Sequence, residues 1–257
     1  MTDSVLLEST REGVRTLTLN RPTQFNAMTG ELLDELLAAF DRVAADDSVR
    51  VVILAGTGKA FCAGHDLKQA RAHEDLDYQR RLFGRSSEIM QRIVALPQPV
   101  IARVHGMTTA AGCQLVAGCD LAVAAAEATF AVSGVRLGLF CSTPAVALTR
   151  NVPLKQSMEM LLTGEFIDAR TALECGLVNR VCKSDELDDC VNELAHNICR
   201  NPPRVVRLGK ELVYRQLNQP LNEAYADATE TIACNMMMDE AIEGVDAFIE
   251  KRKPRWN

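Results

Sequence analysis

The sequence predicts an α/β fold followed by a helical C-terminal region, and two observations support this prediction. Apolar runs of strand length alternate with helical periods up to about residue 155, a pattern typical of β–α crossovers in a largely parallel sheet. From about Lys155 onward the periodicity is almost wholly helical, with one strand-like break at 177–181. The composition shifts at 195–203 (HNICRNPPR), and we therefore expect a core over 1–200 and a helical region over 201–257.

The individual elements follow from the same patterns. Residues 14–20 alternate as in a strand and are expected to pair with 5–8 across a polar turn. A helix is expected over 29–45, with Thr29 as its N-cap and Glu31 in its first turn. The other expected elements are a strand at 49–56, a helix at 76–95, a strand at 100–105, a helix at 110–117, strands at 121–125 and 129–132, and helices near 185–200, 203–217 and 220–250.

Composition excludes several classes of protein. The net charge of −6 and the pI near 5.4 argue against nucleic-acid binding, and no run of about 18 apolar residues predicts a membrane span. Nine cysteines are scattered singly, without a C-x-x-C pair and without histidines at ligand spacing. We therefore expect reduced thiols, no metal and a cytoplasmic location, since the N-terminus also lacks the basic and apolar segments of a targeting signal.

The stretch from Pro99 to Ala145 carries the first functional signal. An apolar run bounded by Pro99 and Gly106 predicts a buried strand, which is followed by small residues at 108–112 and then by helical spacing. N–H groups at such a helix start lack partners and lie at the positive end of the helix dipole, so they can bind an anion or a developing oxyanion. The alternative is a turn of small residues that is packed tightly for steric reasons alone.

A second strand, at 49–58, runs into KAFCAGHDLK at 59–68, about 45 residues before HGMTTAAGCQL. Together with LNRPTQFNAM at 19–28 and FIEKRKP at 248–254, these motifs resemble the crotonase (enoyl-CoA hydratase/isomerase) family over almost the whole chain. The segments GHDLK, TAAGCQL and GVRLGLFCSTP look most like one animal group of that family. The resemblance implies a ββα spiral core, a helical C-terminal trimerisation region, and a homotrimer or a hexamer made from two trimers.

The resemblance also implies an acyl-CoA ligand, no additional cofactor, and an oxyanion hole made by the backbone N–H groups of His65 and Ala111. The two glutamates of the family's hydratases fall on Gln114 and Gly134. Hydration of a C=C bond needs a base and an acid, and neither residue supplies one. We therefore expect no efficient hydration by two glutamates, and we expect Gly134 to leave open space. Glutamate at both positions is then expected to create hydratase activity.

Other side chains have structural alternatives. Isomerases of the family sometimes carry their carboxylate near positions that correspond to Cys141, Ser142 and Thr143. None of the three is an acid near neutral pH; a lowered pKa would make Cys141 a thiolate, and an inert buried thiol is the alternative. Further alternatives are an acid–base role of the His65 ring, a helix-capping role for Asp66, and core positions for His105 and Cys113.

Coenzyme A contacts are carried over to nine positions by the resemblance. Lys68 is expected to contact a phosphate, and Phe248 and Lys251 are expected to reach the nucleotide, often across a subunit boundary. Lysine and arginine pair well with phosphate, although the basic clusters here also fit solvated helix ends. The nine positions are Phe25, Ala27, Met28, Ala63, Asp66, Leu67, Lys68, Phe248 and Lys251.

Three readings of the function stay open from the sequence. The first is an acyl-CoA enzyme of fatty acid metabolism, nominally an enoyl-CoA hydratase or isomerase, that acts by stabilising a thioester enolate with altered acid and base groups. The second is a non-catalytic acyl-CoA-binding pseudoenzyme. The third is a different reaction, such as thioester hydrolysis, with space at Gly134 for a bulky acyl group.

Overall fold

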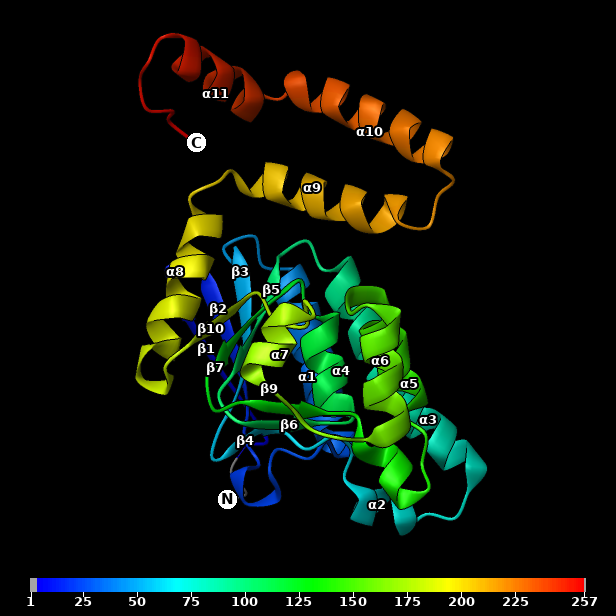
Figure 1. The fold of residues 1–257 in the computed structure, drawn as a ribbon. Helices are drawn as coiled ribbons and strands as arrows, with labels where there is room; N and C mark the ends of the chain where they lie inside the picture. The colour runs from blue at the N-terminus through cyan, green and yellow to red at the C-terminus, as the bar shows by residue number, and fades with distance from the viewer. Residues whose placement is uncertain (1–3, 257) are drawn as a thin grey trace. The chain divides into compact units, whose positions relative to one another are not determined.

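The computed structural model describes residues 4–256, and the chain divides into two compact units, Met1–Ala195 and His196–Asn257 (Figure 1). The first unit contains a six-stranded sheet in which β1 and β2 are antiparallel and all other neighbouring strands are parallel. The strands are, in sheet order, β1 (Leu6–Arg11), β2 (Val14–Leu19), β3 (Val51–Gly56), β5 (Val100–Val104), β7 (Leu121–Ala125) and β10 (Arg180–Cys182).

A second, smaller sheet is built from very short strands that follow the strands of the first. In this sheet β4 (Ala60–Cys62), β6 (Met107–Thr109) and β8 (Thr129–Ala131) are parallel neighbours, and β9 (Ile167–Asp168) joins β8 antiparallel. β3 continues into β4, β5 into β6, and β7 into β8, so that successive turns of the chain add one strand to each sheet. This repeat gives the ββα turns that the resemblance to the crotonase family implies.

The helices of the first unit complete these turns. In the first helix, α1, the side chain of Thr29 caps the N-terminus by accepting a hydrogen bond from Leu32 N–H at 3.3 Å. The buried face of α1 includes Leu32, Leu36 and Phe40, all fully shielded from solvent in the hydrophobic core. The helices are α1 (Gly30–Ala44), α2 (Leu67–Arg71), α3 (Leu76–Ala95), α4 (Ala111–Gly118), α5 (Ser142–Asn151), α6 (Leu154–Thr163), α7 (Ala169–Glu174) and α8 (Leu187–Cys199), the last four residues of which belong to the second unit.

The second unit contains α9 (Pro203–Gln216), α10 (Leu221–Met236) and α11 (Asp239–Ile249). Ion pairs connect its helices, including Arg215 with Asp227 at 2.7 Å and Arg204 with Glu240 at 3.3 Å. Many of its large apolar side chains are exposed in the single chain, among them Leu217, Leu221, Tyr225, Met237 and Phe248.

The expected elements and the observed ones differ in a few places. The strand expected at 177–181 lies at 180–182, and the helical segment expected at 220–250 is split after Met236. The sequence did not predict α2, α5 or the short strands β4, β6 and β9, and of these β4 and β6 lead directly into the site described below. Among residues 4–256, no helix combines the length and the apolar character that crossing a bilayer requires.

Candidate functional site

The peptide group between Gly64 and His65 is held in place from both sides by Met28. Met28 N–H donates to the Gly64 carbonyl at 2.7 Å, and Asp66 N–H donates to the Met28 carbonyl at 2.9 Å. The His65 N–H lies between these two bonds and has no acceptor among residues 4–256. A fixed and unpaired backbone donor therefore follows β4.

A second unpaired donor lies at the start of α4. Ala110 has φ 49° and ψ −117°, a strained conformation for a residue with a side chain, and its N–H donates to the Ala131 carbonyl at 2.9 Å. The next residue, Ala111, begins the helix, and its N–H has no acceptor in the described part of the chain. A Cβ atom added to Gly64 would lie 3.2 Å from Ala111 N. The unpaired N–H groups of His65 and Ala111 thus belong to segments in direct contact.

Close backbone approach explains the small residues around these donors. A Cβ atom added to Gly112 would lie only 2.2 Å from the Cys62 carbonyl oxygen, so α4 packs directly against β4. The Thr109 hydroxyl donates to the Ala63 carbonyl at 2.9 Å and ties the two turns together. Steric packing therefore accounts for the small residues at this contact, and the two unpaired N–H groups lie beside it.

Gln114 is the fourth residue of α4 and is only 3% exposed. Its backbone N–H donates to the Ala110 carbonyl at 3.0 Å, which anchors the helix start. Its side-chain Oε1 is buried and has no hydrogen-bond partner in the described residues. A buried amide oxygen without a partner costs free energy, and a ligand or a water molecule that donates to it would recover that energy.

The expectation of open space at Gly134 is wrong. A Cβ atom at this position would lie 2.5 Å from the Leu139 carbonyl oxygen and 2.8 Å from Cys141 Sγ. The turn is closed further by two hydrogen bonds, from Leu139 N–H to the Gly134 carbonyl at 2.9 Å and from Gly134 N–H to Cys141 Sγ at 3.3 Å. The chain itself fills the place that the Cβ atom of a glutamate would take.

The structure does not favour the acid–base role that the sequence left open for the His65 ring. Burial lowers the pKa of His65 to about 4, so the imidazole is neutral at pH 7. The ring packs edge-on against Phe83, with 4.8 Å between centroids, and its Nε2 is buried without a partner among residues 4–256. The backbone amide of His65, and not a charged ring, is the feature available for chemistry.

The cysteines near the site are poor nucleophiles. Burial raises the pKa of Cys113 to about 12, and burial also raises the pKa of Cys141 despite the hydrogen bond from Gly134 N–H. His105 contacts the Gly58 carbonyl through Nε2 at 3.0 Å, and its pKa is lowered chiefly by burial. These directions favour the inert reading of Cys141 and a core role for Cys113. The core position expected for His105 is not borne out, because the residue is only partly buried and its Nδ1 has no hydrogen-bond partner among residues 4–256.

Two residues that the sequence analysis overlooked organise the loop before Met28. Asn26 is fully buried; its Oδ1 accepts from Arg21 N–H at 2.8 Å, and its Nδ2 lies within 3.1 Å of three carbonyl oxygens. Those oxygens belong to Thr57, Ala60 and Phe61. The available signal was a polar Arg and Asn inside the LNRPTQFNAM motif, where we assigned only Phe25, Ala27 and Met28.

Asp66 is engaged within the protein. One carboxylate oxygen accepts from Gln69 N–H at 3.1 Å and caps α2, and the other lies 3.2 Å from Arg21 Nη2. Burial alone would raise the pKa of Asp66, but the hydrogen bonds from Gln69 and Arg21 and the guanidinium charge hold it below its usual range. The helix-capping alternative therefore describes this side chain.

The remaining carried-over positions fall into two groups. Phe25, Ala27, Met28 and Ala63 form one loop cluster with His65; Phe25 is 48% exposed, whereas the Met28 side chain is buried in the core. The exposed side chains of Leu67 and Lys68 follow in α2. Phe248 and Lys251 lie in the second unit, where Phe248 is 84% exposed at the end of α11.

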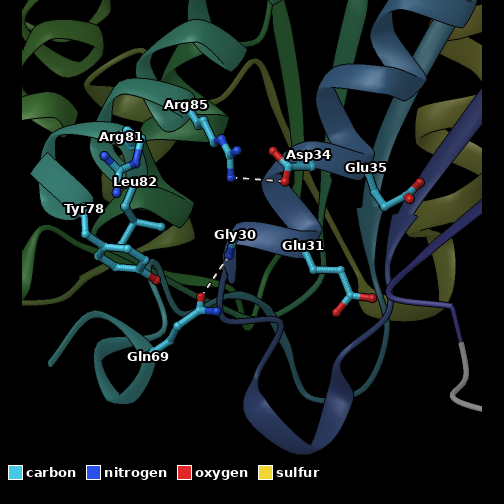
Figure 2. A pocket seen from close by; sticks show the side chains of 9 residues that line it. All are labelled: Gly30, Glu31, Asp34, Glu35, Gln69, Tyr78, Arg81, Leu82 and Arg85. Carbon is cyan, nitrogen blue, oxygen red and sulfur yellow. Dashed lines mark hydrogen bonds and ion pairs between the residues drawn. The ribbon is translucent and has the colours of Figure 1, made fainter. Parts of the chain in front are cut away.

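A hollow of about 510 Å³ lies between α1 and α3, and none of the predicted site residues lines it (Figure 2). Its arginines face acidic partners: Arg85 lies 3.1 Å from Asp34, and Arg81 lies 3.9 Å from Asp75. Gln69 Oε1 accepts from Gly30 N–H at 2.9 Å across its floor. We assign no role to this hollow. Within the described residues, no group of three or more His, Cys, Asp or Glu side chains is arranged to hold a metal ion.

Comparison with known proteins places this geometry in context. The family model described as enoyl-CoA hydratase/isomerase matches residues 9–257. The chain is 44% identical over 244 residues to the enoyl-CoA hydratase domain-containing protein 3 of Xenopus laevis, covering 95% of this chain and 83% of that protein. It is 55% identical to an enoyl-CoA hydratase structure from Mycobacterium smegmatis, with a TM-score of 0.96 and 98% of each chain covered. The human domain-containing protein 3 structure is 40% identical, with a TM-score of 0.96, covering 98% of this chain and all of that chain.

These comparisons confirm the crotonase-like fold and the resemblance to the domain-containing protein 3 group. They also correct the expected cytoplasmic location, because the Xenopus relative and those from zebrafish, rat, mouse and human all carry the word mitochondrial in their names. The physical reason for the error is that scattered thiols fit any reducing compartment and do not single out the cytoplasm.

Proposed function

Because the chain belongs to the enoyl-CoA hydratase/isomerase family, we propose that it binds an acyl-CoA thioester and polarises the thioester carbonyl with the backbone N–H groups of His65 and Ala111. The observation that carries this proposal is the contact between the two segments that present these unpaired donors. Two donors aimed at one oxygen stabilise the negative charge that develops there when a thioester becomes an enolate or is attacked.

The proton chemistry of a two-carboxylate hydratase is not part of this proposal. A positioned acid or base contributes roughly 10²–10⁴ in rate for each role. Gln114 is a neutral amide, residue 134 is a glycine in a closed turn, and the buried His65 ring, with a pKa of about 4, is a weak base. The site therefore supports oxyanion stabilisation without efficient transfer of protons by side chains.

The coenzyme A moiety is proposed to lie along the loop with Phe25, Ala27 and Ala63, where the Phe25 ring is exposed. Lys68 supplies an exposed ammonium group for a phosphate, in the helix that Asp66 caps. Phe248 and Lys251 are proposed nucleotide contacts, and a homotrimer or paired trimers would give the exposed apolar side chains of the second unit a partner.

A second candidate is an acyl-CoA-binding protein that does not catalyse a reaction. The closed turn at Gly134 and the amide at Gln114 favour it, because both carboxylate positions of the hydratases are lost while the donors remain. Thioester hydrolysis loses its supporting argument, since Gly134 offers no room for a larger acyl group.

The test combines turnover and binding on the full chain. Loss of the conjugated enoyl-thioester absorbance is followed with crotonyl-CoA and with a longer trans-2-enoyl-CoA, and calorimetry compares butyryl-CoA with its thioether analogue, S-butyl-CoA. The expected result is slow turnover together with tighter binding of the thioester, because only the thioester has the carbonyl. Rapid hydration would contradict the absence of acid–base groups. Equal affinity for the two ligands would contradict the oxyanion hole.

A further inference from the structure

Arg21 reaches both segments that surround the His65 donor. Its Nη2 lies 3.2 Å from an Asp66 carboxylate oxygen, and its Nη1 donates to the Ala27 carbonyl. Its backbone N–H is held by buried Asn26 at 2.8 Å, so the base of the side chain is fixed as well. The Arg21 and Asp66 side chains are only 17% and 16% exposed, and solvent therefore screens their interaction weakly.

The contact to Ala27 continues through two planar peptide groups. The Ala27 carbonyl and the Met28 N–H belong to one peptide unit, and they point in opposite directions because the unit is planar and trans. Met28 N–H donates to the Gly64 carbonyl at 2.7 Å, and that carbonyl shares its peptide unit with the His65 N–H. A hydrogen-bonded series thus runs from the guanidinium group through two peptide units to the unpaired donor.

We propose that Arg21 is a positioning residue for the oxyanion hole: it fixes the direction of the His65 N–H and strengthens that group as a donor. Direction follows from the rigid peptides, whose orientation is set when their carbonyls are held. Donor strength follows from polarisation, since each hydrogen bond in a series polarises the next and this series begins at a positive charge. The inference rests on the proposed function, because it assigns Arg21 to the donor that contacts the thioester.

Asp66 has a supporting part in this arrangement. Its N–H bonds to the Met28 carbonyl at 2.9 Å, on the other side of the His65 peptide, and its carboxylate holds the guanidinium group. The ion pair therefore couples the residue immediately after the donor to the arginine that polarises the donor. Weakening the ion pair between Arg21 and Asp66 is expected to make both the guanidinium group and the His65 peptide less firmly held.

The experiment uses Arg21→Met and Asp66→Asn, with Arg15→Met as a matched control. The Arg15 side chain is also 17% exposed and also bridges two segments, with Glu8 and Asp46 each at 3.1 Å. It belongs to β2, and its ion-pair partners lie outside the site. A general loss of stability is therefore expected in both arginine variants, whereas a change at the donor is expected only at Arg21.

Two readouts report on the donor itself. The first is the preference for butyryl-CoA over S-butyl-CoA, which is expected to fall about 2- to 10-fold in Arg21→Met, the range of a single hydrogen bond. The second is the absorption band of the CoA thioester of 4-(dimethylamino)cinnamic acid, which shifts to the red when its carbonyl is polarised. This red shift is expected to shrink in Arg21→Met and Asp66→Asn and to remain at the wild-type value in Arg15→Met.

The outcomes separate this inference from the proposed function. A wild-type protein that binds the cinnamoyl thioester without any red shift would contradict the oxyanion hole itself. A normal wild-type shift that persists in folded Arg21→Met, or that falls equally in Arg15→Met, would overturn the role of Arg21 alone. If Arg21→Met fails to fold, Asp66→Asn decides, because asparagine still caps a helix and a wild-type shift in that variant would overturn the inference.

Discussion

Replacing Gly134 by alanine is expected to destabilise the protein, because the new methyl group has no room. Its carbon would lie 2.5 Å from the Leu139 carbonyl oxygen, so this backbone must retreat by about 0.5 Å to reach the 3.0 Å that real Cβ atoms require. Such a shift strains the two hydrogen bonds that close the turn, from Leu139 N–H to the Gly134 carbonyl and from Gly134 N–H to Cys141 Sγ.

The magnitude follows from two opposing effects. Overpacking of this kind costs about 1–3 kcal/mol, and the lower entropy of the unfolded alanine chain returns about 0.4–1 kcal/mol. A net loss of about 1–2 kcal/mol corresponds to a fall in melting temperature of roughly 2–8 °C for a chain of this size. Glutamate adds more atoms at the same point and is expected to cost more.

The assay is thermal unfolding at one protein concentration, followed by the crotonyl-CoA hydration assay. Gly84→Ala is the control, since a Cβ atom there meets nothing within 4 Å in the middle of α3, and this variant is expected to melt higher than wild type. The double variant Gln114→Glu/Gly134→Glu is expected not to gain hydratase activity, which reverses the expectation from sequence. An unchanged or raised melting temperature of Gly134→Ala, or rapid hydration by the double variant, would refute the argument from crowding.

Two further predictions concern His65 and the C-terminal helix. The pKa of His65 is about 4 in the folded chain, and its ordinary value is 6.5. Between these two pH values the unfolded chain binds a proton at His65 and the folded chain does not. The free energy of unfolding should therefore fall by up to about 3 kcal/mol as the pH is lowered from about 6.5 to 4. Denaturant unfolding of wild type and His65→Gln should show their difference in stability changing across this window; a constant difference would mean that the ring is not buried in its neutral form. Lys251→Ala is expected to weaken coenzyme A binding about two- to fivefold in calorimetry, the range of one exposed charge pair, and Lys253→Ala is the matched control. An unchanged affinity in Lys251→Ala would remove this residue from the site.

The long periodic elements were readable from sequence. The helix expected at 76–95 begins and ends at the residues the structure shows, and Thr29 caps α1 as expected, because amphipathic spacing and capping chemistry are local signals. The three-residue strands β4 and β6 carry too few residues for a period to be visible, so only tertiary pairing reveals them.

The candidate site was predictable only in part. The resemblance of the motifs to the crotonase family pointed to His65 and Ala111, which lie on segments in contact. The crowding at Gly134 was invisible, because it depends on a carbonyl five residues away that folds back on the turn. Arg21 was missed because its effect is exerted through backbone groups, which have no signature in the sequence.

The buried Asn26 side chain also bears on the order in which the molecule assembles. Its carbonyl partners Thr57, Ala60 and Phe61 lie 31, 34 and 35 residues further along the chain. Contacts between distant residues require loop closure before they contribute stability, so they form late in folding. A refolding chain is therefore expected to regain its helices and compactness before it regains affinity for a ligand, and ligand binding during refolding would report the final docking of the loop at 20–28 onto the β3–β4 segment.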